Sequence, residues 1–522
     1  MNPAFRTAGR LIVLAVCATA VHAGGVVTAS QPRAAPSVSA WLSGAVEAMG
    51  GEALLTSMTA VETSGVSVWY HREQSERPEG PWLTSFTEFT DVRQFHADAV
   101  LRRARERGFS TNDWVDSSEW TTSPTVLVTS GVAMTHGSGT WTPAGTPPDL
   151  EALPVSLAPE RVVLAAREAA DLGAEPDETL DGYRHHVVAF SSAGAHVRLI
   201  LNVPSLLPKA VEVTRRHPYN MFLAPWGDVT ERVTFGVWTL EPNGLRYPRL
   251  WAFSTNGQPD GSVSLTKVRA NPPIDERDFT VPEDIRSQLV AARQPIADLA
   301  LGLTDRPPRE LAPDIVSVPG RFGIVMVNQP DGVVIIDAPL SSEYSGLAIA
   351  DAQRRFGGAR VKAVVTTSDA WPHIGGIREY VARGVPVYAL DLNVPILTRL
   401  IAARYESAPD ALARSHNRPA LHAVTGRISV GSGPSRFDIY PFRTATGERQ
   451  MMIYWPTHRL LYTSDLFTIR NEFVFLPQQV SEAVAAVTRE HLDVATAFGM
   501  HYDPVPWATV VAAAAPPQRV PR

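Results

Sequence analysis

The sequence predicts a protein of two parts, in which an antiparallel β-rich half is followed by a half where strands and helices alternate. Residues 60–279 contain short apolar–polar alternating segments separated by turn residues, which is typical of antiparallel sheet. From residue 311 onward, short apolar runs alternate with segments of helical spacing, which is the order of an α/β fold. The 522 residues are too many for one ordinary domain, and the 43 prolines and 36 glycines indicate many turns.

The first residues predict export. Arg6 and Arg10 precede an apolar run that has the length of a signal peptide and is too short to span a bilayer comfortably. Small residues follow it, so residues 1–23 are predicted to be a signal peptide and 24–37 a Pro/Ala/Ser-rich tether. We therefore expect a soluble exported protein, periplasmic or extracellular, without an integral membrane segment after signal removal. The alternative is that the apolar run is a short membrane anchor.

Composition argues against two classes of function. The formal net charge is −6 and 19% of the residues are charged, so no basic surface for nucleic acid is indicated. The single cysteine, Cys17, lies inside the predicted signal peptide. The mature chain is therefore expected to contain no disulfide and to use no thiolate chemistry.

Residues 38–285 are predicted to form the antiparallel domain. A helical pattern at 38–55 is followed by alternating segments such as 183–191 and 197–203. The order GGEALLTSMTAVETSG, then strands, then Leu-Leu-Pro-Lys before a further strand, resembles the periplasmic lipoprotein-carrier fold. That resemblance implies a curved sheet, or half-barrel, around an apolar cavity, with an unknown small molecule or a lipid-like ligand as the partner.

The remaining boundaries follow from changes in composition. Residues 286–310 combine one amphipathic stretch with a polar run and are predicted to be a linker. Residues 311–510 form the predicted α/β domain, with a helix at 344–356. Residues 511–522 are rich in proline and alanine without a packing pattern, so we expect a mobile tail there.

The second half is organised around one strand, loop and helix. Residues 361–366 are β-branched and apolar, which predicts a buried strand, and Gly375-Gly376 opens a helix after a polar loop. This arrangement resembles the metal-binding turn of the metallo-β-lactamase superfamily, where the loop reads T-H-x-H-x-D-H-x-G-G. The segment VVIIDAP also matches the second-strand segment of that superfamily, where the acid corresponding to Asp337 is structural. The resemblance implies an αββα sandwich and metal-dependent hydrolysis.

Most of the ligands of the first metal site of that superfamily are absent. Matched backwards from the two glycines, the two spaced histidines correspond to Ser368 and Ala370, and the aspartate corresponds to Pro372. The third ligand of the same metal corresponds to Thr446. A hydroxyl is a weak ligand and a methyl group is none, so the resemblance implies that this first site is lost.

Three ligands of the second site remain in the order of the superfamily. They are His373 in the loop, Asp465 after a later strand, and His501 near the C-terminus. Two histidines and one carboxylate with an open position form the ligand set of a catalytic zinc, and the same set binds iron(II). Asp369, four residues before His373, is the candidate for the catalytic carboxylate that Pro372 replaces.

Two functions remain open from the sequence. The first is an exported, divergent metallo-β-lactamase-fold hydrolase with at most one metal ion, which would be zinc, iron or manganese. The alternative is a catalytically inactive binding protein without a metal, in which the β-domain takes up an apolar ligand and the second domain is a relic. Single histidines more often make ordinary hydrogen bonds than bind metals, so the joint arrangement of the three residues decides between the two.

Overall fold

The structure is a computed structural model that describes residues 37–72, 82–108, 120–129, 132–137, 140–415, 417–444, 449–470, 473–475 and 477–514. The predicted signal peptide and nearly all of the predicted tether lie outside these residues. Residues Val38–Arg522 form one compact unit. Among the described residues, no helix combines the length and the apolar character needed to cross a membrane.

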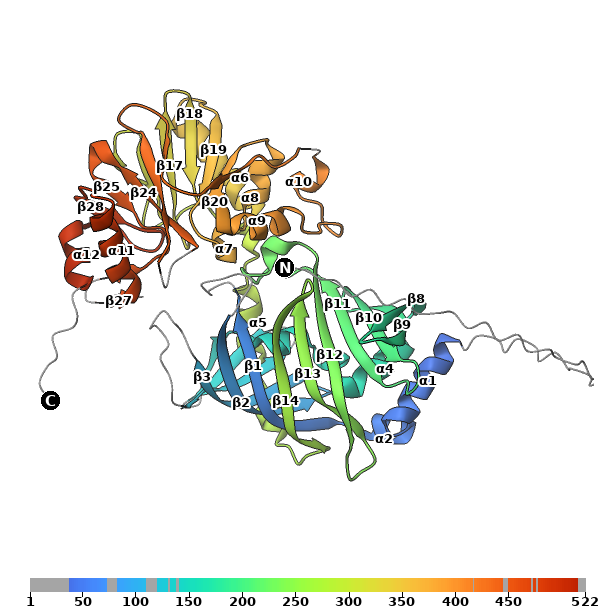
Figure 1. The fold of residues 1–522 in the computed structure, drawn as a ribbon. Coiled ribbons are helices and arrows are strands. Elements are labelled where there is room, and N and C mark those ends of the chain that lie inside the picture. Colours follow the sequence, from blue (N-terminus) through green and yellow to red (C-terminus); the bar gives the residue numbers. More distant parts are fainter. Residues whose placement is uncertain are drawn as a thin grey trace, which may run out of the picture. The chain divides into compact units, whose positions relative to one another are not determined.

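The first half is an antiparallel sheet of fourteen strands, as the alternating pattern predicts. Thirteen strands follow one path in the order β7-β6-β5-β3-β2-β1-β14-β13-β12-β11-β10-β9-β8, and β4 pairs with β3. In Figure 1 the long strands of this sheet curve strongly. The strands are β1 (Ala60–His71), β2 (Leu83–Gln94), β3 (Ala99–Gly108), β4 (Thr121–Thr122), β5 (Thr125–Thr129), β6 (Val132–Gly137), β7 (Thr140–Ala144), β8 (Gly173–Leu180), β9 (Tyr183–Ser192), β10 (Ala195–Asn202), β11 (Pro208–Arg215), β12 (Val229–Leu240), β13 (Arg246–Thr255) and β14 (Gln258–Ala270).

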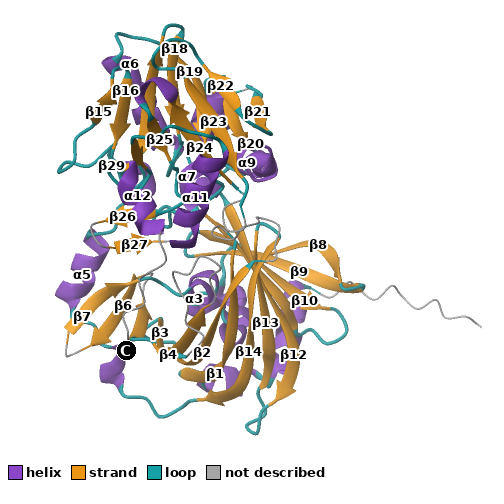
Figure 2. Ribbon diagram, turned by 60° about the vertical axis from the view of Figure 1, so that its left-hand side comes forward, coloured by secondary structure: helices purple, strands orange, loops and turns teal. Residues whose placement is uncertain are grey.

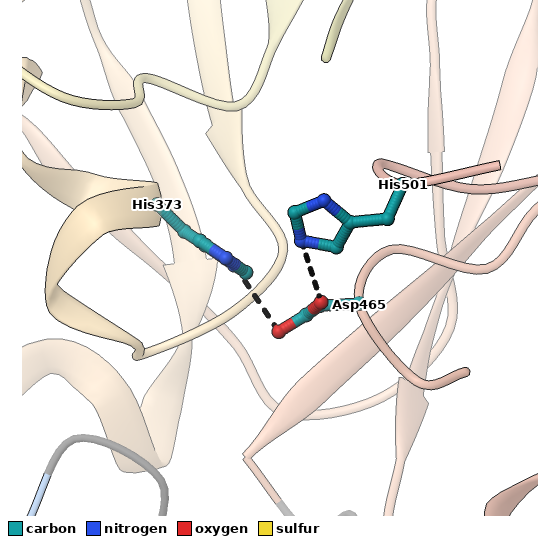
Figure 3. A group of neighbouring side chains, drawn as sticks. All are labelled: His373, Asp465 and His501. Carbon is teal, nitrogen blue, oxygen red and sulfur yellow. Dashed lines mark ion pairs between the residues drawn. The ribbon is translucent and has the colours of Figure 1, made fainter. Parts of the chain in front are cut away.

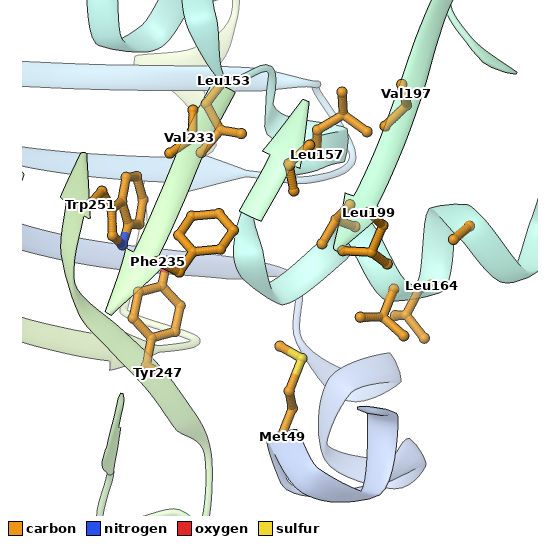
Figure 4. Close-up of a cluster of buried hydrophobic side chains, with 14 of the residues drawn as sticks. Met49, Leu153, Leu157, Leu164, Val197, Leu199, Val233, Phe235, Tyr247 and Trp251 are labelled. Atoms are coloured by element: carbon orange, nitrogen blue, oxygen red, sulfur yellow. The ribbon is translucent and has the colours of Figure 1, made fainter. Parts of the chain in front are cut away.

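Helices cover one face of this sheet and fill it with apolar side chains. They are α1 (Val38–Met49), α2 (Glu52–Ser57), α3 (Pro148–Ala152) and α4 (Pro159–Glu168). Met49 of α1 and Leu164 of α4 share one buried cluster with Leu199, Phe235 and Trp251 of the strands (Figure 4). A cavity of about 10 Å³ lies beside α3, and a more open one of about 470 Å³ is lined by Gly65, Phe89 and Ala104 of the strands.

The second half contains two larger sheets. One has seven strands in the order β15-β16-β17-β18-β19-β20-β21, and the other has six in the order β22-β23-β24-β25-β28-β29. A small hairpin pairs β26 with β27. The strands are β15 (Arg309–Ala312), β16 (Ile315–Val318), β17 (Ile324–Gln329), β18 (Gly332–Ile336), β19 (Val361–Thr366), β20 (Val387–Leu390), β21 (Leu421–Val424), β22 (Ile428–Val430), β23 (Phe437–Phe442), β24 (Gln450–Trp455), β25 (Leu460–Tyr462), β26 (Thr468–Arg470), β27 (Phe473–Phe475), β28 (Thr496–Phe498) and β29 (Val505–Pro506).

The burial of alternate side chains shows that these two sheets form the inner layers of an αββα sandwich. On β17, Ile324 and Met326 pack toward a cluster with the helices, whereas Val325 and Val327 pack toward the six-stranded sheet. Figure 2 shows both sheets with helices outside them. The helices are α6 (Ser342–Arg355), α7 (Trp371–Ile374), α8 (Ile377–Ala382), α9 (Val394–Ile401) and α10 (Ala411–Arg414) on one side, and α11 (Pro477–Arg489) and α12 (Trp507–Ala514) on the other.

The predicted linker at 286–310 is packed structure. It contains most of α5 (Glu283–Ala291) and the short helix η4 (Ile296–Asp298), and it ends inside β15. The side chain of Ile296 is buried between the two sheets, and its N–H donates to the Pro218 carbonyl at 2.7 Å. The division of the chain into two independent domains therefore stays a prediction.

The predicted mobile tail begins too early. Residues 511–514 belong to α12, because the buried Val510 and the partly buried Ala513 and Ala514 pack on the core under α11. Residues 515–522 lie outside the described part of the chain.

Candidate metal site

His373 enters the site on a short helix that follows β19. The N–H of His373 donates to the Ala370 carbonyl at 2.9 Å, and the Pro372 carbonyl accepts from Leu340 N–H at 2.7 Å, so both sides of the turn are held. The imidazole is buried and its Nδ1 has no hydrogen-bond partner among the described residues. Burial lowers the pKa of His373 to about 4, which keeps the ring neutral at pH 7.

Asp465 and His501 leave the same edge of the second sheet. Their strands, β25 and β28, are parallel neighbours, so the residues that follow both strands meet at one edge. The Thr463 N–H donates to the Phe498 carbonyl at 2.9 Å, and the Met500 N–H donates to the Ser464 carbonyl at 2.8 Å. The two loops are thus fixed to one another by backbone hydrogen bonds.

The three side chains converge, as the sequence order predicts (Figure 3). His501 Nε2 lies 3.0 Å from Asp465 Oδ1, and His373 Nδ1 lies 3.5 Å from Asp465 Oδ2. One ligand atom from each residue lies within 4.8 Å of the other two. Burial would raise the pKa of Asp465, but the adjacent imidazoles of His373 and His501 lower it, so this carboxylate is ionised at neutral pH.

Phe322 forms an apolar wall of the site that sequence reasoning did not find. Its ring centre lies 5.0 Å from that of His373 and 5.4 Å from that of His501, and the side chain is buried. Phe322 lies two positions before the start of β17, and nothing in its local sequence pattern indicates which side chains it contacts. Packing of this kind restricts rotation of both imidazoles and limits access of solvent.

Asp337 lies behind the ligands and ties their loops together. Its carboxylate accepts hydrogen bonds from Thr367 N–H at 2.8 Å and from Tyr462 Oη at 2.6 Å, and Thr367 Oγ1 lies 2.7 Å from Ser464 Oγ. Burial raises the pKa of Asp337 to about 6, against the opposing effect of these hydrogen bonds. The acid thus links the end of β19 with the turn that carries Asp465.

The other matched positions do not join the group. Ser368 is buried, and its Oγ accepts from Ala370 N–H at 3.2 Å. Asp369 is half-buried and lies outside the His373–Asp465–His501 group, and Thr446 lies outside the described residues. Trp371 packs on Trp226, with ring centres 5.0 Å apart.

The residues present fit a single metal ion. A neutral, buried imidazole nitrogen without a partner, a second imidazole and an ionised carboxylate are the donors that zinc takes in catalytic sites and that iron(II) takes in two-histidine, one-carboxylate sites. A cavity of about 40 Å³ adjoins His501 and is also lined by Gly320 and Tyr462. This volume is sufficient for water, since one water needs roughly 10–15 Å³ on this measure.

Comparisons with known proteins give structural similarity only. No protein-family model matches the sequence, and no curated protein matches it. Solved structures that resemble part of the chain include DIM-1 metallo-β-lactamase, at 11% identity and a TM-score of 0.32, over 40% of this chain and 96% of that one. A metallo-β-lactamase from Pontibacter korlensis shares 13% identity, with a TM-score of 0.32, over 40% and 96%. One from Erythrobacter litoralis, with β-mercaptoethanol in its active site, shares 14%, with a TM-score of 0.31, over 40% and 93%.

Proposed function

We propose that this protein is an exported hydrolase of divergent metallo-β-lactamase-like fold that uses one metal ion, held by His373, Asp465 and His501. The observation that carries the proposal is the convergence of these three side chains within 4.8 Å, although they come from three separate segments, the short helix α7 and the loops after β25 and β28. Two imidazoles and a carboxylate from distant parts of a chain rarely come together without a function. Burying an imidazole nitrogen without a hydrogen-bond partner, such as Nδ1 of His373, costs stability, so such an arrangement is not expected unless it serves one.

The ion would supply Lewis acidity and an activated water when bound. The side chains of this chain would position it: His373 provides a neutral nitrogen, His501 provides a second imidazole nitrogen, Asp465 provides the negative charge, and Phe322 limits rotation of the rings. Zinc is the first candidate, with iron or manganese as alternatives, because two histidines and one carboxylate suit all three metals.

We further propose that Asp369 is the catalytic carboxylate that accepts a proton from the attacking water. It lies on the loop between β19 and α7, outside the group of ligands, and is half-buried. A base in this position has to reach the water directly or through one intermediate water, which a loop residue can do once substrate is bound. In the Asp369→Asn variant, hydrolysis should therefore fall while the metal content stays unchanged.

The metal content of protein purified without chelator tests the proposal. We expect about one metal ion per chain by elemental analysis, lost in His373→Ala and in His501→Ala and retained in Ser368→Ala. A matched control is His422→Ala, because His422 is exposed and stacks on Tyr388 away from the site. Hydrolysis of activated model esters should disappear with the metal and return when it is added back.

Two results would overturn the proposal. The first is a wild-type protein that takes up no metal even when zinc, iron(II) or manganese is supplied, which would favour the binding-protein alternative with an unknown small molecule or lipid-like ligand. The second is a metal that survives both histidine substitutions, which would place it elsewhere. Circular dichroism of each variant separates loss of metal from loss of fold.

A further inference from the structure

Another cavity, of about 500 Å³, is lined by Trp371, which lies two residues before His373 in the chain. It is formed where the start of β12 and the β13–β14 turn approach α7 and α9. Its volume is in the range of cavities that bind drug-sized molecules, roughly 300–1,000 Å³. Side chains that line it and matter for its chemistry are Arg72, Trp226, Trp371, Ile396, Arg399 and Arg404.

Two indoles form the apolar wall of the cavity. Trp226 and Trp371 meet edge to face at an angle of 68°, and both are largely buried. The guanidinium carbon of Arg72 lies 5.1 Å from the ring centre of Trp371, and Arg72 is held by a buried ion pair with Asp260. Asp260 also accepts from Thr255 Oγ1 at 2.6 Å, so the position of Arg72 is fixed.

The walls are rigidly connected, so the cavity is preformed. Asp228 accepts hydrogen bonds from the N–H groups of Glu406 and Ser407 at 2.6 and 2.9 Å, and the Asp228 N–H donates to the Arg404 carbonyl at 2.7 Å. Tyr405 Oη donates to the Pro225 carbonyl at 2.8 Å. A preformed cavity costs a ligand less ordering entropy than one that must close around it.

The cavity favours a negative ligand. Arginines outnumber acids among its lining residues by three to one, since Asp228 is its single acid and is already hydrogen-bonded by the loop at 406–407. Arg72 is paired with Asp260, and Arg404 pairs with the exposed Glu406. Arg399 is exposed and has no ion pair or hydrogen bond with any described residue, so its charge is available to a ligand.

We propose that this cavity binds a small organic anion with an apolar body, such as an aromatic carboxylate or sulfonate. The body packs on Trp226, Trp371 and Ile396, and the anionic group pairs with Arg399. Aromatic walls contribute contact area and ring packing, and a guanidinium matches a carboxylate or sulfonate with two parallel hydrogen bonds. The site goes beyond the proposed hydrolase activity and needs no metal.

Anilinonaphthalene sulfonate is a suitable probe, because it combines an apolar body with a single negative charge. Titration of the metal-free full-length protein, followed by fluorescence and calorimetry, should give one saturable site. Arg399→Gln should weaken binding about fivefold to tenfold, which is the effect of losing one charge-assisted contact. Ala402→Trp should abolish binding, because Ala402 lines the cavity and the larger indole would occupy part of the space that the probe needs.

Arg418→Gln is the matched control, because Arg418 is exposed, has no described partner and does not line the cavity. Its affinity for the probe should equal that of the wild type. An uncharged phenylnaphthylamine should bind more weakly than the sulfonate, and Arg399→Gln should not change its affinity. Equal losses in Arg399→Gln and Arg418→Gln, or unchanged binding in Ala402→Trp, would overturn the proposal. If the probe does not bind as expected, the measured metal content of the protein is unaffected. The anion-site proposal and the metal proposal can therefore be overturned independently.

Discussion

Asp337 illustrates how a residue that touches no metal can determine the geometry of the site. Its carboxylate is almost completely buried and accepts from both the backbone and the hydroxyl of Thr367, as well as from Tyr462. Asp337 has a left-handed backbone conformation, with φ of 69°, which is unfavourable for most residues other than glycine. The surrounding hydrogen bonds compensate for this strain and hold the loops of His373 and Asp465 at a fixed separation.

Asp337→Asn should destabilise the protein and weaken metal binding together. The amide presents a donor toward Thr367 or Tyr462 in place of an acceptor, which leaves a buried group unsatisfied at a cost of about 1–3 kcal/mol. Metal affinity should fall about tenfold, which is typical of lost outer hydrogen bonds around metal ligands. Asp331→Asn is the control, because Asp331 is 66% exposed and forms its ion pair with Lys362, away from the site. Chemical denaturation and metal titration measure both effects.

At the scale of residues, the sequence order predicts that His373, Asp465 and His501 come together, as they do, but it does not predict the residues around them. The glycine pair set the register of the loop, so His373 could be identified by counting, and Asp465 and His501 followed in chain order. Phe322 could not be found this way, because a contact between loops depends on the packing of two sheets rather than on local pattern. Whether Asp369 acts as a base stays a prediction for the same reason.

At the scale of elements, Gly375 and Gly376 have a packing role beyond opening a helix. A Cβ on Gly376 would lie 2.0 Å from Ser345 Oγ and 2.5 Å from the Ser341 carbonyl, at the N-terminus of α6. A Cβ on Gly375 would lie 2.5 Å from the Leu340 carbonyl. The turn between α7 and α8 therefore approaches the backbone before α6 so closely that no side chain fits. This close approach keeps α7, and with it His373, against the sheet.

Gly376→Ala and Gly346→Ala should have opposite effects on stability. Gly376→Ala would push the turn between α7 and α8 away from the start of α6. It should lower the free energy of unfolding by about 2–3 kcal/mol, in the range found for overpacked cores. Gly346 lies inside α6, and the nearest atom to its added Cβ is Glu379 Oε1 at 3.7 Å, which is an ordinary contact. Alanine there should stabilise the protein by roughly 0.5–1 kcal/mol through helix propensity. Urea denaturation of both variants measures the contrast, and equal signs would refute it.

His217 connects the end of β11 to α3 and to β12. Its Nδ1 lies 3.2 Å from Glu151 Oε1 and its Nε2 lies 3.2 Å from Glu231 Oε2, and the side chain is buried. Burial would lower the pKa of His217, but the hydrogen bond to Glu151 and the close carboxylate of Glu231 outweigh it, despite nearby Arg215, and raise the pKa to about 9. The histidine is therefore charged in the folded protein at neutral pH.

This raised pKa predicts a pH dependence of stability. A histidine with a raised folded-state pKa contributes stability that is fully present below its unfolded pKa of 6.5 and is lost as pH rises through 9. The difference corresponds to roughly 3 kcal/mol. The unfolding free energy of the wild type should fall by this amount between pH 6.5 and 9 relative to His217→Gln. His196→Gln, at an exposed position, should keep the wild-type slope.

Several elements agree with their sequence patterns because the pattern is local. The strand predicted at 361–366 is β19 with the same bounds, and the helix predicted at 344–356 is α6, displaced by two residues at its start and one at its end. The helix α7 escaped prediction, since four residues around a proline carry no periodicity. The predicted tail begins at 511, inside α12, because alanines indicate a helix only when the surface on which they pack is known.

At the scale of the whole molecule, the segment at 217–229 joins the two halves. The sequence indicates a turn with a packing indole at Trp226-Gly227-Asp228, and the structure shows what that indole packs against. Trp226 and Val229 belong to the same buried cluster as Ile396, Leu397 and Leu400 of α9. Gly227 has φ of 68°, and a Cβ there would lie 2.1 Å from the Arg404 carbonyl. A contact of this range cannot be predicted from composition, and the division of the chain at the predicted linker 286–310 stays a prediction.

These contacts predict that the two halves unfold together. Burying an indole such as Trp226 is worth roughly 3–5 kcal/mol, and the hydrogen bonds to Asp228 add to it, which is a large share of the stability of a typical domain. Calorimetry of the full chain should therefore show one transition. Asp228→Ala should uncouple the halves into two transitions, because it leaves the N–H groups of Glu406 and Ser407 without their acceptor. Asp305→Ala, at an exposed position in the predicted linker, should keep a single transition. Two separated transitions in the wild type would instead restore the independent domains that composition suggests, and would confine the role of Trp226 to the lining of the cavity that it shares with Trp371.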